Sequence, residues 1–213
     1  MARGSNFTAT LLVWAVPTIF AIVLHEVMHG FVARGLGDET AARAGRLTLN
    51  PLRHVDPFGT LIMPALLLFA HLPVFGYAKP VPVDFSRLRP RRLGMVLVAA
   101  AGPATNFTLA TISALAFRFV QAHTGEFSGT GPILARMILA SVLINVMLGV
   151  FNLLPLLPLD GGRVLAGLLP PGLARPFARL ERYGFILLFL LLYTDWLGRI
   201  MDPLINSIVG ALL

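Results

Sequence analysis

The chain has 213 residues, of which 56% are hydrophobic and only 13% are charged, and its mean hydropathy is +0.79. This composition excludes an ordinary soluble domain and indicates an integral membrane protein. The formal net charge of +7 comes from 17 basic residues, all of them arginine except Lys79. Because the arginines lie mostly between apolar runs, they are typical of loops that face the cytoplasm and anionic lipid, and we expect no nucleic-acid partner.

Several apolar runs are long enough to cross a bilayer at about 1.5 Å per residue. The clearest runs are residues 7–36, 93–119, 132–154 and 177–197, followed by a half-length apolar segment at 203–213. The apolar part at residues 7–24 is long for a signal-peptide core and lacks a small-residue cleavage site after it, so we expect it to be retained. The predicted fold is an all-α polytopic bundle of about five to six membrane segments, in a single domain over residues 1–213.

Residues 57–75 form an apolar segment that is short for a span and contains Pro64. If this segment turns back, nearly all basic residues face one side of the membrane. The exceptions are Arg3, Arg118, Arg136 and Arg199. The positive-inside rule therefore favours a re-entrant segment, with the amino terminus outside.

The next segment carries prolines at the alternate positions 80 and 82, which exclude a helix. They favour an extended strand or a polyproline conformation. Non-helical backbone at membrane depth survives only where it is buried in protein or lines a wet cavity. We therefore predict a short extended or β element next to a functional site.

The sequence "HEVMH" at residues 25–29 contains the first candidate functional residues. His25 and His29 are four positions apart, so a helix places them one turn above each other, where they can bind one ion. Zinc suits neutral imidazole and takes three protein ligands in catalytic sites, with the fourth position left to water. Glu26 can then accept the proton of that water. The alternative is a structural polar cluster.

Asp160 is the best candidate for a third ligand. It follows Pro155 and Pro158, which break the preceding helix, and Gly161 and Gly162 permit a tight backbone that turns the carboxylate inward. The alternative is a loop aspartate that caps the next helix. The two histidines and Asp160 can meet only if an even number of crossings separates them, which again favours re-entry of residues 57–75.

Three motifs in this order resemble the site-2 proteases, which are zinc metalloproteases that cut substrates within the membrane. They are "HEVMHG", "AAAGPATNF" (99–107) and "NLLPLLPLDGG" (152–162). The stretches "GRLTLNPLRHVDPFGT" and "FGYAKPVPVD" are similar to the short bacterial and archaeal subgroup without a PDZ or CBS domain. The resemblance covers about residues 21–164.

The resemblance implies His25, His29 and Asp160 as ligands of one catalytic zinc ion, and Glu26 as the catalytic acid and base. It also matches Asn152 to a family asparagine near the active site and Asn106 to the asparagine of the glycine-proline motif. Asn152 could contact the scissile carbonyl or the oxyanion. For both asparagines the alternative is an interhelical hydrogen bond.

The function implied is hydrolysis of peptide bonds in or near transmembrane segments of membrane proteins, within the lipid bilayer. The catalytic core would cover about residues 7–165, followed by C-terminal helices at about 177–213. The expected location is the cell (inner or plasma) membrane, as a multi-pass protein with its active site toward the cytoplasm. The rival hypothesis is a non-catalytic zinc-binding membrane chaperone or regulator with the same fold. His54 and Asp56 belong to the subgroup pattern without a derivable role.

Overall fold

The computed structural model describes residues 2–72, 76–123, 131–194 and 196–213, and within these ranges the regular elements are all helical. The three long helices are α1 (Ala2–Gly35), α4 (Arg91–His123) and α5 (Gly131–Asn152). The shorter elements, in chain order, are α2 (Thr40–Arg43), η1 (Pro51–Arg53), η2 (Pro57–Ile62), α3 (Met63–Phe69), α6 (Asp160–Leu168), α7 (Pro171–Arg179), α8 (Glu181–Tyr193) and α9 (Trp196–Leu212).

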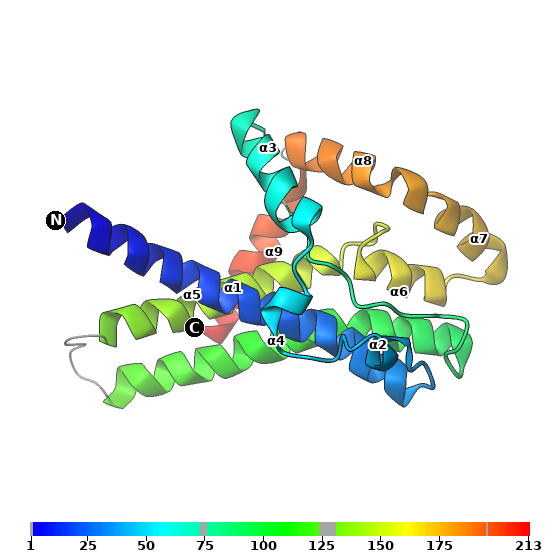
Figure 1. The fold of residues 1–213 in the computed structure, drawn as a ribbon, viewed down its shortest axis with the longest axis horizontal. Coiled ribbons are helices and arrows are strands. Elements are labelled where there is room, and N and C mark those ends of the chain that lie inside the picture. Colours follow the sequence, from blue (N-terminus) through cyan, green and yellow to red (C-terminus); the bar gives the residue numbers. More distant parts are fainter. Residues whose placement is uncertain (1, 73–75, 124–130, 195) are drawn as a thin grey trace.

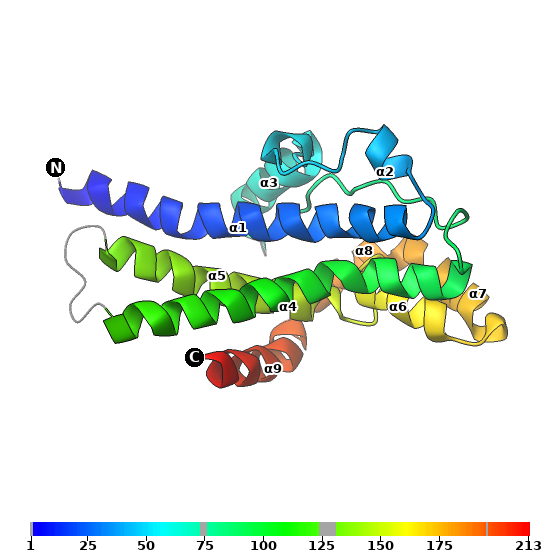
Figure 2. The same ribbon diagram turned by 90° about the horizontal axis from the view of Figure 1, so that it is seen from below.

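The three long helices form the centre of the molecule and lie side by side (Figures 1 and 2). Each is long and apolar enough to cross a membrane, which confirms the predicted runs at 7–36, 93–119 and 132–154. Alanines such as Ala21, Ala110 and Ala140 are buried between them. Small side chains let membrane helices approach closely, so van der Waals packing can hold the bundle together.

The direction of the helices brings distant motifs to one end of this bundle. Figure 2 shows α1 and α5 running in the same direction and α4 running in the opposite direction. The C-terminal end of α1 and the segment after α5 therefore lie toward the same end. Two long helices, α4 and α5, separate residues 25–29 from Asp160. This is an even number of crossings, as predicted from the sequence for residues that must meet at one end.

The C-terminal part differs from the prediction. The expected span at 177–197 is divided between α7, α8 and the start of α9, and α8 and α9 meet at an angle of 77°. The predicted half-length helix is also longer, because α9 begins at Trp196 and contains Pro203. Five to six membrane segments are not confirmed: three described helices meet the criteria for a span, or four if the bent pair counts as one.

Residues 57–69 form the π-helical turn η2 and the seven-residue helix α3. Asp56 caps this start, accepting hydrogen bonds from the amides of Phe58 (3.0 Å) and Gly59 (2.7 Å). At about 1.5 Å per residue the pair measures about 20 Å, too short for a hydrocarbon core of about 30 Å. Re-entry of this segment stays a prediction.

Residues 76–84, which we call the strap, are neither helix nor strand, and no β-strand occurs within the described ranges. The predicted β element is therefore not confirmed. In Figure 1 the strap runs from the start of α3 across the bundle toward α4. Its buried residue Val81 packs against α1, next to the "HEVMH" sequence.

Candidate metal centre

Helix α1 supplies two of the converging side chains. His25 and His29 lie one turn apart in this continuous 34-residue helix, and both imidazoles are buried. Their Nε2 atoms are 3.1 Å apart. The spacing predicted from the sequence therefore places both rings at one point inside the bundle.

Asp160 reaches the same point from the first residue of α6. Its Oδ2 lies 3.1 Å from Nε2 of His25 and 3.3 Å from Nε2 of His29. The turn before it is tight, because a Cβ on Gly161 would lie 2.1 Å from the carbonyl oxygen of Leu153. Glycine at this position therefore permits the backbone approach that carries Asp160 to the histidines.

Each histidine is oriented by a hydrogen bond on its other nitrogen. Nδ1 of His25 lies 2.6 Å from Oδ1 of Asn106, and Nδ1 of His29 lies 2.7 Å from the carbonyl oxygen of Val98. Asn106 directs its amide nitrogen to the carbonyl oxygen of Ala21, which can only accept, so its Oδ1 faces His25. Both acceptors require Nδ1–H, so in the neutral form of each imidazole the lone pair lies on Nε2.

With neutral imidazoles, the result is a group of three atoms that each offer a lone pair. Oδ2 of Asp160 is buried and accepts no hydrogen bond from the residues that the structure describes. One atom from each of the three side chains lies within 4.8 Å of the other two. Such atoms repel one another unless a cation lies between them, and two imidazoles with one carboxylate suit zinc.

Gly102 of α4 closes one side of this group. A Cβ at this position would lie 2.5 Å from Nε2 of His29 and 2.6 Å from Nε2 of His25. The absence of a side chain therefore lets the backbone of α4 pass directly beside both nitrogens.

Glu26 lies on the neighbouring face of α1 and contacts the strap. Its Oε2 accepts a hydrogen bond of 2.9 Å from the backbone amide of Val81. The sequence placed Glu26 beside the first histidine, but it did not indicate this partner, because a backbone donor 55 residues away leaves no pattern.

The two predicted asparagines have different surroundings. Asn106 contacts His25 and donates to Oδ1 of Asn145 (2.9 Å), so it links α1, α4 and α5. Asn152 ends α5 and donates to the carbonyl oxygen of Leu148 in its own helix (3.0 Å). Sequence reasoning missed Asn145, although a polar side chain within an apolar helix is itself a signal.

Comparison with known proteins decides the family. The model of peptidase family M50 matches residues 119–193, which include Asp160 but not residues 25–29. A Bacillus subtilis protein named "Putative zinc metalloprotease YwhC" is 38% identical over 211 residues, covering 97% of this chain and 92% of that protein. The chain belongs to peptidase family M50, the site-2 proteases.

Further relatives have the same kind of name. A Mycolicibacterium smegmatis protein named "Putative zinc metalloprotease Rip2" is 31% identical, with 92% of this chain and 73% of that protein covered. "Zinc metalloprotease MJ0392" of Methanocaldococcus jannaschii is 27% identical, with 86% and 40% covered. No solved structure matches the chain. The names of these relatives include zinc, and the three potential ligand atoms of this chain fit that metal.

His54, which belongs to the subgroup pattern, lies outside the three converging side chains of the M50 protein. Its Nε2 is 2.9 Å from the carbonyl oxygen of Thr48, and its own carbonyl oxygen accepts from the amide of Lys79 (2.8 Å). Asp56 caps η2. These contacts fix the loop and one end of the strap, so both residues have a structural explanation.

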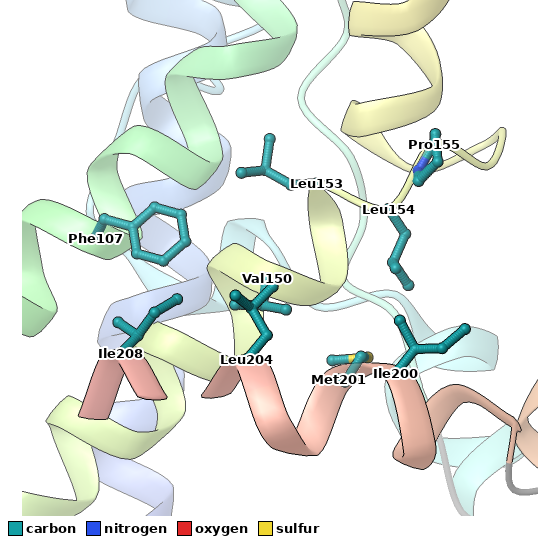
Figure 3. A pocket seen from close by; sticks show the side chains of 9 residues that line it. All are labelled: Phe107, Val150, Leu153, Leu154, Pro155, Ile200, Met201, Leu204 and Ile208. Atoms are coloured by element: carbon teal, nitrogen blue, oxygen red, sulfur yellow. The ribbon is translucent and has the colours of Figure 1, made fainter. Parts of the chain in front are cut away.

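An apolar pocket of about 380 Å³ lies between α4, the end of α5 and α9 (Figure 3). All its lining side chains are apolar. They are Phe107, Val150, Leu153, Leu154, Pro155, Ile200, Met201, Leu204 and Ile208. Phe107 and Leu153 directly follow Asn106 and Asn152 in the chain, so the pocket lies beside these polar residues but is not lined by them.

Proposed function

We propose that this M50 protein is an intramembrane zinc metalloprotease that hydrolyses peptide bonds in or near transmembrane segments of membrane proteins. The observation that carries the proposal is the convergence of three potential ligand atoms beside a glutamate, within a bundle of membrane-length helices. A buried polar group of this kind is costly in a membrane protein unless it has a partner or a function.

In this proposal His25, His29 and Asp160 bind one zinc ion. Zinc in such a site polarises the scissile carbonyl and lowers the pKa of bound water to about 7. The hydrogen bonds from Nδ1 of the histidines keep both rings in the orientation for binding. Asn106 is thus a positioning residue, because it acts through His25.

Glu26 is the proposed general base and acid. Its carboxylate takes the proton of the attacking water and later delivers it to the nitrogen of the leaving amine. Asn152 is proposed to contact the scissile carbonyl or the oxyanion, which supports catalysis where negative charge develops. One hydrogen of its amide nitrogen is used in the bond to the carbonyl oxygen of Leu148, and the second is available for such a contact.

The substrate must be unwound before cleavage, because helical hydrogen bonds shield its peptide bonds. The strap offers an edge for such an extended chain. Tyr77 and Lys79 direct both their amides and their carbonyls toward the protein. The opposite edge then contains the carbonyls of Pro80 and Pro82, which have no N–H, so a substrate strand would donate its amides there.

We also propose the orientation of the single domain in the cell membrane. The end that carries His25, His29 and Asp160 also carries most of the arginines, including Arg34 and Arg43. Under the positive-inside rule this end faces the cytoplasm. Residues 7–165 form the proposed catalytic core, with the helices after residue 177 packed against it.

Cleavage of a panel of single-span peptides in detergent, with zinc measured in each preparation, tests the proposal. Wild type is expected to cleave at least one peptide, and Glu26→Gln is expected to keep its zinc while kcat falls about 10²- to 10⁴-fold, the usual contribution of a general base. Undiminished cleavage by Glu26→Gln would exclude Glu26 as the base. One zinc per wild-type chain without any cleavage would support the non-catalytic regulator instead.

A further inference from the structure

The side chain of Glu26 is held by the strap. The amide of Val81 donates to its Oε2 at 2.9 Å. Among the described residues, the Glu26 side chain has no second hydrogen-bond partner. Val81 is buried and Glu26 is partly buried, so the bond is partly shielded from water. A hydrogen bond to an ionised group in such surroundings is short and strong. One carboxylate oxygen is therefore fixed, and Oε1 remains available.

Val81 is fixed against α1 at a second point. Gly30 lies one turn after Glu26 on the same face of the helix. A Cβ on Gly30 would lie 2.9 Å from Cγ1 of Val81, so the valine fits where the helix has no side chain. The amide and the side chain of Val81 thus contact positions 26 and 30 together.

The rest of the strap keeps this amide aimed at Glu26. The amides of Tyr77 and Lys79 donate to the carbonyl oxygens of Gly59 (3.1 Å) and His54 (2.8 Å). The amides of alternate residues 77, 79 and 81 therefore all face the protein, as in an extended chain. Pro80 and Pro82 restrict φ on both sides of Val81, so little conformational freedom remains to be lost there.

We infer that the backbone amide of Val81 is a positioning group for Glu26, which fixes Oε2 so that Oε1 can take the proton of the attacking water. The inference rests on the proposed protease function and adds a task for the strap. Geometry is the reason, since a general base must stay within hydrogen-bond reach of the proton that it abstracts. A freely rotating glutamate would meet this condition only part of the time.

Val81→Pro removes the donor at the position where proline fits best, because residue 81 already precedes Pro82 and is restricted to extended conformations. Val81→Ala keeps the amide and reports the loss of side-chain packing alone. Val83→Pro makes the same backbone change two residues later, where the amide has no hydrogen-bond partner among the described residues. Replacing Val81 by its α-hydroxy acid exchanges N–H for oxygen and keeps the side chain.

The experiment measures kcat, KM and zinc per chain on a single-span peptide that wild type cleaves. We expect kcat to fall about 10- to 100-fold in Val81→Pro and in the hydroxy-acid variant, with KM and zinc content kept, as for the loss of one hydrogen bond to a charged group. Val81→Ala should lose several-fold less, and Val83→Pro should stay near wild type.

Different results would exclude the role of the Val81 amide and the proposed protease function. If wild type cleaves and the hydroxy-acid variant keeps wild-type kcat, or Val81→Pro loses no more than Val81→Ala, the amide does not position Glu26. Combination with Glu26→Asp gives a further check, since the shorter side chain should already have lost the bond and Val81→Pro should then add little. Wild type that holds zinc but cleaves no peptide would overturn the protease function, and the inference with it.

Discussion

At the scale of single residues, the candidate metal centre depends on groups that set the orientation of its ligands. His25 and His29 each donate from Nδ1 to a buried oxygen, of Asn106 and of Val98. The sequence predicted the converging residues because it shows directly the spacing of the histidines and the presence of ionisable side chains in apolar segments, where their burial costs free energy. It could not predict the contact with Val98, because every residue has a backbone carbonyl and the side chain gives no indication of it. It could not predict which residue Asn106 contacts, because this depends on how α4 is rotated about its axis.

Gly102→Ala should damage the metal centre without weakening α4. The added Cβ would lie 2.5 Å from His25 and His29, so both rings must shift, and displacement of about 1 Å can cost about 100-fold in activity. Alanine is otherwise favoured over glycine in a helix by about 1 kcal/mol. Zinc affinity, measured by competition with a chelator, is expected to fall.

Gly210→Ala is the matched control for this change, because nothing lies within 4 Å of a Cβ built there in α9. It should bind zinc as wild type does and be slightly more stable to heat. Equal zinc affinity in both alanine variants would show that α4 does not pass beside the imidazoles as described.

At the scale of elements, the strap is tied to the end of α1 by one aspartate. Asp38 is fully buried, accepts from the amide of Thr40 at 3.0 Å through Oδ1, and accepts from the amide of Asp84 at 2.7 Å through Oδ2. Sequence reasoning identified the strap by its prolines but assigned Asp38 no role. An aspartate in a turn is common, so its presence indicated no role. Its contact with the amide of Asp84, 46 residues away, forms only in the folded chain.

Asp38→Asn should destabilise the protein and change its response to acid. Burial raises the pKa of Asp38, but hydrogen bonds from Thr40 and Asp84 outweigh burial and lower the pKa overall. A carboxyl with a lower pKa in the folded state adds stability above its unfolded pKa of about 3.9, and this is lost as the pH falls. Thermal unfolding in detergent at pH 7 should show a loss of about 1–3 kcal/mol.

The same measurement near pH 3 should show a smaller difference between wild type and Asp38→Asn. Carboxyls remote from Asp38 titrate in both proteins and cancel in the comparison, whereas Asp84 repels the Asp38 carboxylate and contributes to the difference. A difference that grows toward low pH would contradict the charged state of Asp38 in the fold.

In the whole molecule, the parallel helices α1 and α5 and the antiparallel helix α4 bring residues from both halves of the chain to one end of the bundle (Figure 2). The three spans were predictable because long apolar runs exceed the bilayer thickness. The division of the C-terminal part into α7, α8 and α9 was not predictable, because the sequence stays apolar on both sides of the break at Thr194. Its hydroxyl donates to the carbonyl oxygen of Leu190 at the end of α8.

The orientation can be tested directly because the chain contains no cysteine. Gln121→Cys lies near the end of α4, and Gly172→Cys lies in α7 toward the opposite end of the bundle. A membrane-impermeant maleimide should label position 172 in inside-out vesicles and position 121 in right-side-out vesicles. Labelling of both positions from one side would contradict the proposed topology.

Zinc content shows whether Asp160 completes a metal site with His25 and His29. Wild type, Asp160→Ala and the half-exposed control Asp84→Ala are purified in detergent, dialysed against a mild chelator and assayed for metal. We predict one zinc per chain in wild type and in Asp84→Ala, and loss of the zinc in Asp160→Ala, because two imidazoles alone bind it weakly. One retained zinc in Asp160→Ala, or none in wild type, would contradict the account.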